Sequence, residues 1–200
     1  MKLNNFSIKN KAIIFSLIII AILALVFTYL DFGVFTAESS VNSNAEAFSS
    51  MNAESVSRGT LYVYIEGDQE LEPYLIEELK EDLASYNIKV FANLKEKFDA
   101  PILAISIINK DSFYTPMHSK AKINVLSFYS SSGSTKYFRE FVQSNFGAQD
   151  PVVMFNTTQG PQYLRKSELT IEDSLTGIFS MNAQKRHLSE EISKKIASEI

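Results

Sequence analysis

Side chains suited to acid–base, nucleophilic or metal chemistry are scarce in this 200-residue chain. It contains no cysteine and only two histidines, His118 and His187. Neither histidine has a partner at the spacing of a known metal motif, so we expect no metal site and no catalytic cysteine. His118 is expected in an exposed loop. His187 follows Lys185 and Arg186 and is expected on the solvated face of the last helix.

Hydroxyl and carboxylate side chains are plentiful, but none falls in a recognised catalytic pattern. The segment SSSGST at 130–135 lacks the lysine and second glycine of a nucleotide-binding loop, so it is expected to be a hairpin turn. The carboxylate pairs Glu77–Glu78 and Glu190–Glu191 lie on the polar faces of predicted helices. We therefore expect no catalytic residue, no cofactor and no enzymatic activity. The alternative is a ligand-binding or hydrolytic site built from residues that are distant in sequence.

Two short segments are suited to contacts rather than to catalysis. The segment DSFYTPM at 111–117 carries Phe113, Tyr114 and Met117 between two predicted strands. Its apolar area fits either a partner contact or a loop packed under the sheet. The triplet Asn-Thr-Thr that begins at Asn156 matches an N-glycosylation acceptor.

The domain that must position these side chains follows one long apolar segment. The segment Ala12–Leu30 (AIIFSLIIIAILALVFTYL) holds 19 residues without a charge. As a helix with a rise of about 1.5 Å per residue it would be about 28 Å long, close to the ~30 Å hydrocarbon core of a bilayer. The segment therefore predicts a transmembrane helix over 12–30, with the lipid bilayer as its partner.

The flanking charges predict the orientation of this helix. Residues 1–11 contain three lysines and no acidic residue, and the first basic residue after Leu30 is Arg58. The positive-inside rule makes 1–11 a cytoplasmic tail and places the rest of the chain outside the cell membrane. A cleaved secretory signal is the alternative, with 37–39 as its candidate cleavage site. However, an apolar run of 19 residues is longer than the usual ~7–15 residues of a signal core.

Composition separates a linker from a folded domain. Residues 36–58 contain seven serines and three asparagines and few aliphatic residues, so 31–58 is expected to be a flexible linker. Without the three lysines of the tail, the chain has 16 basic and 23 acidic residues, a net charge of −7. Such an acidic exterior would repel phosphates, so we expect no nucleic-acid partner. Residues 59–200 are enough for one extracytoplasmic domain.

Apolar periodicity predicts that this domain is α+β, with a mixed β-sheet packed by two helices. The expected elements are a strand at 61–65, a helix at 71–86, strands at 88–91, 102–108, 122–129, 152–155 and 164–171, and a helix from 182 onward. The segment 135–142 fits either a helix or the return strand of a hairpin. The helical stripes expected to share one core are Leu71, Leu75, Ile76, Leu79, Leu83 and Tyr86 in the first helix, and Leu188, Ile192, Ile196 and Ile200 in the second.

The order of a strand, a helix, several strands and a closing helix over residues 60–200 resembles the small envelope domains of LptE-like lipoproteins, which help to assemble lipopolysaccharide. In this chain an apolar anchor replaces the lipidated cysteine. The resemblance implies a non-enzymatic adaptor. The sequence thus favours a single-pass, membrane-anchored interaction module of the cell envelope, whose partner is another envelope protein.

Overall fold

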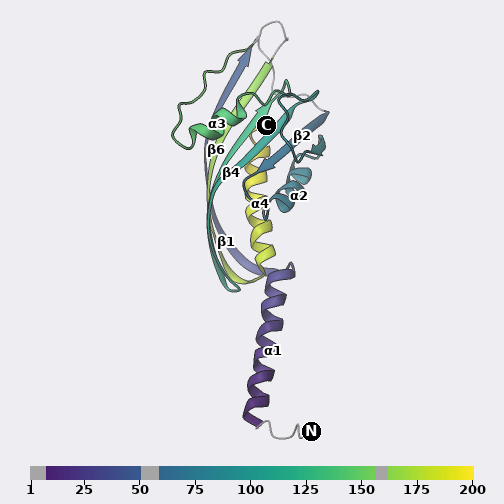
Figure 1. The fold of residues 1–200 in the computed structure, drawn as a ribbon, viewed down its shortest axis with the longest axis vertical. Helices are drawn as coiled ribbons and strands as arrows, with labels where there is room; N and C mark the ends of the chain where they lie inside the picture. Colours follow the sequence, from purple (N-terminus) through teal and green to yellow (C-terminus); the bar gives the residue numbers. More distant parts are fainter. Residues whose placement is uncertain (1–7, 51–58, 156–161) are drawn as a thin grey trace, which may run out of the picture.

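The computed structural model describes residues 8–50, 59–155 and 162–200, with side chains from residue 13 onward. These residues form one helix that projects from a domain of strands and further helices (Figure 1). The helices are α1 (Ile8–Tyr29), α2 (Glu72–Asp82), α3 (Phe138–Ser144) and α4 (Met181–Ala197). The strands are β1 (Gly33–Ser50), β2 (Thr60–Glu66), β3 (Asn87–Val90), β4 (Ile102–Thr115), β5 (His118–Ser130) and β6 (Gln162–Phe179).

All six described strands belong to one sheet in the order β1-β6-β5-β4-β2-β3. β2 is parallel to β3 and to β4, and the other neighbouring pairs are antiparallel. The expectation of an α+β fold with a mixed sheet is therefore confirmed. The strand, helix and strand predicted at the start of the domain are present as β2, α2 and β3, and the two strands are parallel.

Helices α2 and α4 cover one face of the sheet, which we call the inner face (Figure 1). Leu75 and Leu79 of α2 are fully buried in one core cluster with Ile192 and Ile196 of α4, which are 0–1% exposed. The predicted shared core of the two apolar stripes is confirmed. Local sequence explains where α4 begins, because the hydroxyl of its N-cap residue Ser180 accepts a hydrogen bond from the backbone N–H of Ala183.

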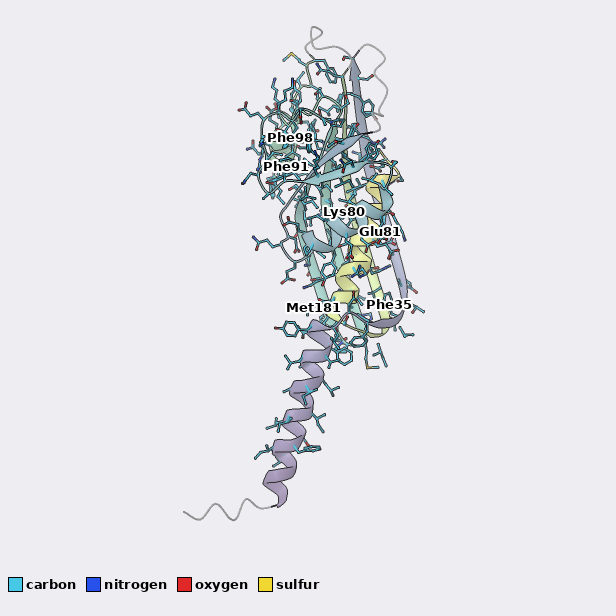
Figure 2. The ribbon with its side chains drawn as sticks, turned by 90° about the vertical axis from the view of Figure 1, so that its right-hand side faces the viewer. Phe35, Lys80, Glu81, Phe91, Phe98 and Met181 are labelled. Atoms are coloured by element: carbon cyan, nitrogen blue, oxygen red, sulfur yellow. The ribbon has the colours of Figure 1, made fainter. Side chains whose placement is uncertain are left out.

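Among the described residues, the opposite, outer face of the sheet is covered in its half distal to α1 and not in the other half. In the distal half, α3 and the segment after β3 build an aromatic cluster on the sheet. The segment that the sequence left open between helix and strand forms α3, because Phe138 and Phe141 are both buried in this cluster. Phe91 and Phe98, labelled in Figure 2, meet edge to face with ring centroids 5.1 Å apart and close the cluster on the β2 side.

The expectation of a flexible linker over 31–58 is wrong for residues 33–50, which form β1. This strand pairs with β6 without a register break over its whole length, from Gly33 opposite Phe179 to Ser50 opposite Gln162. The backbone ladder supplies the hydrogen bonds, so a strand of small polar side chains is held although few of them are buried. Residues 51–58 lie outside the described part of the chain.

Three other sequence expectations are corrected. Residues 152–155 are irregular rather than a strand. The segment 111–117 is not a loop, because β4 continues to Thr115 and turns directly into β5. β6 is also far longer than the predicted strand at 164–171. In both long strands polar residues on the uncovered part of the sheet hid the continuation of the strand.

Helix α1 is joined to the base of the domain by specific contacts (Figure 2). Arg186 of α4 pairs with Asp31 at 2.9 Å, and the amide of Asn182 donates to the carbonyl oxygen of Tyr29 at 3.1 Å. Side chains from Ile13 to Leu25 on α1 are largely exposed. Over the residues that the structure describes, no helix reaches the combination of length and apolarity that a membrane span requires.

Candidate functional site

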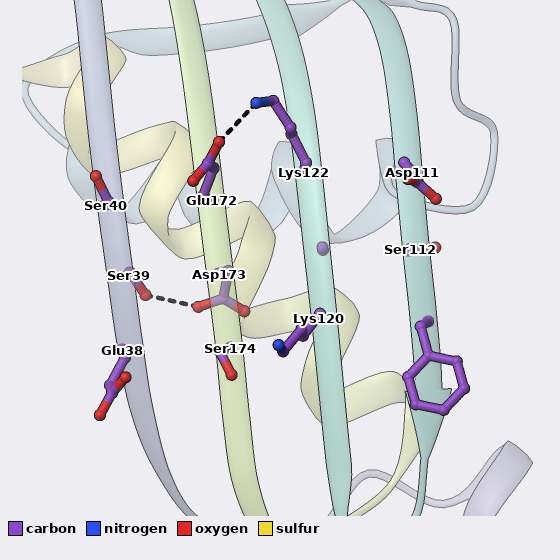
Figure 3. A pocket seen from close by; sticks show the side chains of 12 residues that line it. Glu38, Ser39, Ser40, Asp111, Ser112, Lys120, Lys122, Glu172, Asp173 and Ser174 are labelled. Atoms are coloured by element: carbon purple, nitrogen blue, oxygen red, sulfur yellow. Dashed lines mark hydrogen bonds and ion pairs between the residues drawn. The ribbon is translucent and has the colours of Figure 1, made fainter.

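The half of the outer face nearest α1 carries no covering element among the described residues, and we call it the open face (Figure 3). Strands β1, β6, β5 and β4 lie side by side there and form a shallow depression of about 560 Å³. Its outward-pointing side chains are mostly polar. They are Glu38, Ser40, Asp111, Phe113, Lys120, Lys122, Glu172 and Ser174.

The charges on the open face are solvated. Lys122 Nζ lies 2.6 Å from Glu172 Oε1, and both side chains are more than half exposed. An ion pair of this kind stabilises the fold by about 1 kcal/mol at most. Antiparallel sheets with one solvated face normally alternate polar and apolar residues in this way. The open face is therefore a solvated, largely polar surface.

Phe113, Tyr114 and Met117, which the sequence predicts as partner contacts, do not share one surface in the structure. A register shift between Ile107 and Asn109 inverts the side-chain alternation of β4. As a result Phe113 points to the open face and is 57% exposed, whereas Tyr114 packs on the inner face. The Tyr114 hydroxyl donates to the carbonyl oxygen of Phe179 at 2.8 Å. Met117, in the β4–β5 turn, is also exposed.

A polar cluster centred on the buried Asp173 lies directly behind the open face, between β1, β6 and α4. The Ser39 hydroxyl donates to Asp173 Oδ1 at 2.6 Å (Figure 3). His187 Nε2 lies 3.3 Å from the same carboxylate oxygen and 3.3 Å from Ser39 Oγ. The sequence expectation that His187 lies on a solvated helix face is wrong, because the imidazole packs against Asp173 and against the ring of Phe35.

This cluster holds charge inside the protein. The Asp173 side chain is fully buried, so its negative charge requires a nearby positive partner. The hydrogen bond to Asp173 raises the pKa of His187 above its ordinary value of 6.5; burial opposes this, and the charges of Glu191 and Glu190 reinforce it. When protonated, His187 forms an ion pair with the buried Asp173 that links α4 to the sheet.

The same three residue types occur in serine hydrolases, but the geometry here differs. In a catalytic triad the serine hydroxyl donates to the imidazole, which donates from its other nitrogen to the carboxylate. Here Ser39 donates directly to Asp173, and the same imidazole nitrogen faces both partners. The arrangement therefore differs from a catalytic triad, and its contacts link β1, β6 and α4. Sequence spacing could not reveal it, because Ser39 lies in the segment read as a linker.

The second feature of this region is the free edge of β1. β1 is a terminal strand of the sheet and pairs only with β6 among the described strands. It contains no proline, no lysine and no bulge, and its only charged residues are Glu38 and Glu46. Native proteins usually protect such edges with lysine, proline, bulges or a covering element. The edge of β1 therefore presents unpaired backbone donors and acceptors that suit strand addition.

The remaining sequence-predicted positions contribute little to this site. His118 begins β5 and is half-buried, with Nδ1 3.5 Å from the Thr176 hydroxyl. Asn156, the expected glycosylation acceptor, lies outside the described residues. Where side chains are described, no group of three or more histidine, aspartate or glutamate residues is arranged to hold a metal ion.

Comparison with models of known protein families and with characterised proteins finds no match to this chain.

Proposed function

We propose that this chain is a single-pass membrane protein whose extracytoplasmic domain binds an extended segment of a partner polypeptide along the free edge of β1, without catalysis. The observation that carries the proposal is the long, unprotected edge of β1 beside the polar open face. Main-chain hydrogen bonds along such an edge give affinity, and side chains on alternate positions give specificity.

The membrane anchor in this proposal rests on the uncharged run Ala12–Leu30 and on the flanking charges. The projecting position of α1 fits this reading. Its exposed side chains include Ile13, Phe15 and Leu17, at 58%, 65% and 60% exposure. Full burial of each such side chain is worth about 1.5–3 kcal/mol, and a bilayer provides that burial.

Membrane geometry selects the kind of partner. β1 begins next to α1 and runs away from it (Figure 1). Two identical edge strands related by a two-fold axis across the shared edge pair antiparallel. Such a pair would direct the two α1 helices in opposite directions, which one bilayer cannot accommodate. The edge therefore suits a strand from a different polypeptide rather than β1 of a second copy.

Site-specific photocrosslinking in the native membrane tests this proposal. A photoreactive residue at the exposed Ala45 of β1 is expected to form an adduct with one other protein. Asn42→Lys with Asn44→Lys adds the charges that block edge pairing. Position 44 lies opposite Glu168, so the lysine introduced there has a favourable cross-strand partner and the strand is not destabilised by a like charge. This double variant should abolish the adduct.

The matched control places two lysines elsewhere. Ala84 and Ser85 are exposed just after α2, so Ala84→Lys with Ser85→Lys adds the same charge away from the edge and should leave the adduct intact. A homodimeric adduct, or an adduct that persists in the edge variant, would contradict the proposal.

A further inference from the structure

The end of the domain distal to α1 contains a second depression, which we call the distal cavity. It has a volume of about 690 Å³ and lies where β5 ends and β6 begins, between the loop before β4 and the start of α3. It is separate from the open face, because the two depressions share no lining residue. Its polar lining residues are Lys95, Glu96, Lys97, Ser130, Ser132, Ser134, Thr135, Lys136, Arg139 and Gln162.

Positive charge accumulates at this cavity although the chain as a whole carries a net charge of −4. Four cationic side chains line the cavity with one carboxylate, Glu96. Arg139 is already paired with Glu66 at 2.8 Å. The three lysines are exposed, and none makes an ion pair with a carboxylate in the described part of the chain. The ammonium groups of Lys95 and Lys136 lie 5.4 and 4.9 Å from the ring centroids of Phe91 and Tyr137. A local surplus of unpaired cations attracts an anion.

Serine hydroxyls in the cavity have protons to donate. Ser130 Oγ and Ser132 Oγ lie 3.2 Å apart, so one of the two hydroxyl groups donates to the other. The proton of the accepting hydroxyl is then free to be donated to a ligand. Ser134 Oγ accepts from the backbone N–H of Lys136 at 3.4 Å, and its own proton has no acceptor among the described residues. Hydroxyl donors beside ammonium groups suit the several acceptor oxygens of a phosphate ester.

The lining segments are held together, so the charges are pre-positioned by the fold. Gly133 has φ = 73°, and a Cβ there would lie 2.4 Å from the carbonyl oxygen of Phe98. The Phe98 N–H donates to the Gly133 carbonyl oxygen at 2.9 Å, and the Thr135 hydroxyl donates to the Lys95 carbonyl oxygen at 2.6 Å. These bonds tie the serine-rich turn to the lysine-bearing loop.

The rest of the cavity wall is apolar and aromatic. It is formed by Leu94, Tyr137, Met154, Phe155, Tyr163 and Leu164. The Tyr137 hydroxyl donates to the Met154 carbonyl oxygen at 2.9 Å, which fixes the ring in the wall. A ligand that fills this volume needs an anionic group for the lysines and an apolar body for the wall.

We propose that the distal cavity binds a small organic phosphate ester with an apolar or aromatic body. The lysines bind the phosphate, the serine hydroxyls donate to its oxygens, and the body lies against Tyr137 and Leu164. This inference is independent of the proposed edge contact, because the cavity and β1 share no residue.

Titration of the full chain in detergent micelles with phenyl phosphate tests the proposal, with isothermal calorimetry as the readout. Saturable binding at one site per chain is expected. Lys97→Gln with Lys136→Gln removes two exposed cations from the cavity and should weaken binding about tenfold or more. Lys120→Gln with Lys122→Gln removes the same charge from the open face and should leave the affinity unchanged.

Two parallel titrations separate the contribution of the anionic group to binding from that of the ring. Phenol, which has the ring without the anion, should bind at least about tenfold more weakly than phenyl phosphate. Inorganic phosphate should compete with phenyl phosphate, since both place oxygens on the same lysines. Three results would overturn the proposal. They are the absence of saturable binding, an equal loss of affinity in the two double-lysine variants, and phenol binding as tightly as phenyl phosphate.

Discussion

The side chain of Asp173 is fully buried, yet only one of its two carboxylate oxygens has a hydrogen-bond partner among the described residues. His187 is the cationic group that faces this carboxylate, and Ser39 supplies a hydroxyl. The protonation state of one imidazole therefore affects how well α4 and β1 are held on β6.

The first prediction concerns the pH dependence of stability. Because the pKa of His187 is raised above 6.5 in the folded protein, its stabilising contribution is complete below about pH 6.5 and is lost as the pH rises through the folded-state value. Thermal unfolding of the full chain in detergent should therefore show a lower midpoint at about pH 9 than at about pH 6. His187→Gln, which keeps a donor but cannot become charged, should flatten this change.

The control for the first prediction is the other histidine of the chain. His118→Gln changes a residue on β5 whose ring lies 3.5 Å from the Thr176 hydroxyl and has no contact with Asp173 among the described residues. This variant should retain the pH dependence of the unmodified protein. If the unfolding midpoint changed with pH equally in the unmodified protein and in His187→Gln, the pair of His187 and Asp173 would not stabilise the fold.

At the scale of elements, the amphipathic helices carry most of what the sequence could predict. Four-residue spacing of leucine and isoleucine identified α2 and α4 and their common core. Such a stripe can be recognised in the sequence because a buried helix face requires apolar residues at a regular spacing. β1 gave no such signal, because its order comes from an uninterrupted backbone ladder with β6 rather than from buried side chains.

The candidate site was harder to predict than the helices, because its geometry also depends on backbone pairing and on contacts between distant segments. The sequence left the segment around Phe113 open between a partner contact and a loop packed under the sheet. The register shift in β4, which places Phe113 and Tyr114 on opposite faces, could not be predicted from the residue types. The lysines of the distal cavity come from two segments about 40 residues apart, 95–97 and 136, so the serine-rich turn beside them looked like an ordinary hairpin.

The second prediction, on helix packing, is that Leu79→Ala in α2 lowers the free energy of unfolding by about 2–5 kcal/mol. Leu79 is 0% exposed in the inner-face core, so truncation leaves a cavity in addition to the lost burial. Denaturant unfolding of the full chain in detergent measures the change.

The matched variant on the same helix is Lys80→Ala. Lys80 is exposed, and its truncation should change the free energy of unfolding by about 0.5 kcal/mol at most. Similar losses in both variants would mean that α2 does not pack on the sheet through the Leu79 face.

At the scale of the whole molecule, the domain is attached directly to α1 rather than through a long tether. Asp31 pairs with Arg186, and the Ser180 N–H donates to the carbonyl oxygen of Phe32 at 2.8 Å. The end of the sheet where β1 and β5 begin and where β4 and β6 end therefore lies at the level where α1 ends (Figure 1). In our account this orientation presents the edge of β1 along the membrane normal and holds the distal cavity at the end farthest from the bilayer.

The central claim is that α1 anchors the chain and that the domain stands outside the membrane, and cysteine labelling tests it most directly. The chain has no cysteine, so Ser85→Cys in the domain and Ser7→Cys in the tail each introduce a single thiol. A membrane-impermeant maleimide added to intact cells should label Ser85→Cys at once and Ser7→Cys only after permeabilisation, with both proteins retained in alkali-washed membranes. Release of the chain by the alkaline wash, or protection of Ser85→Cys in intact cells, would contradict the account.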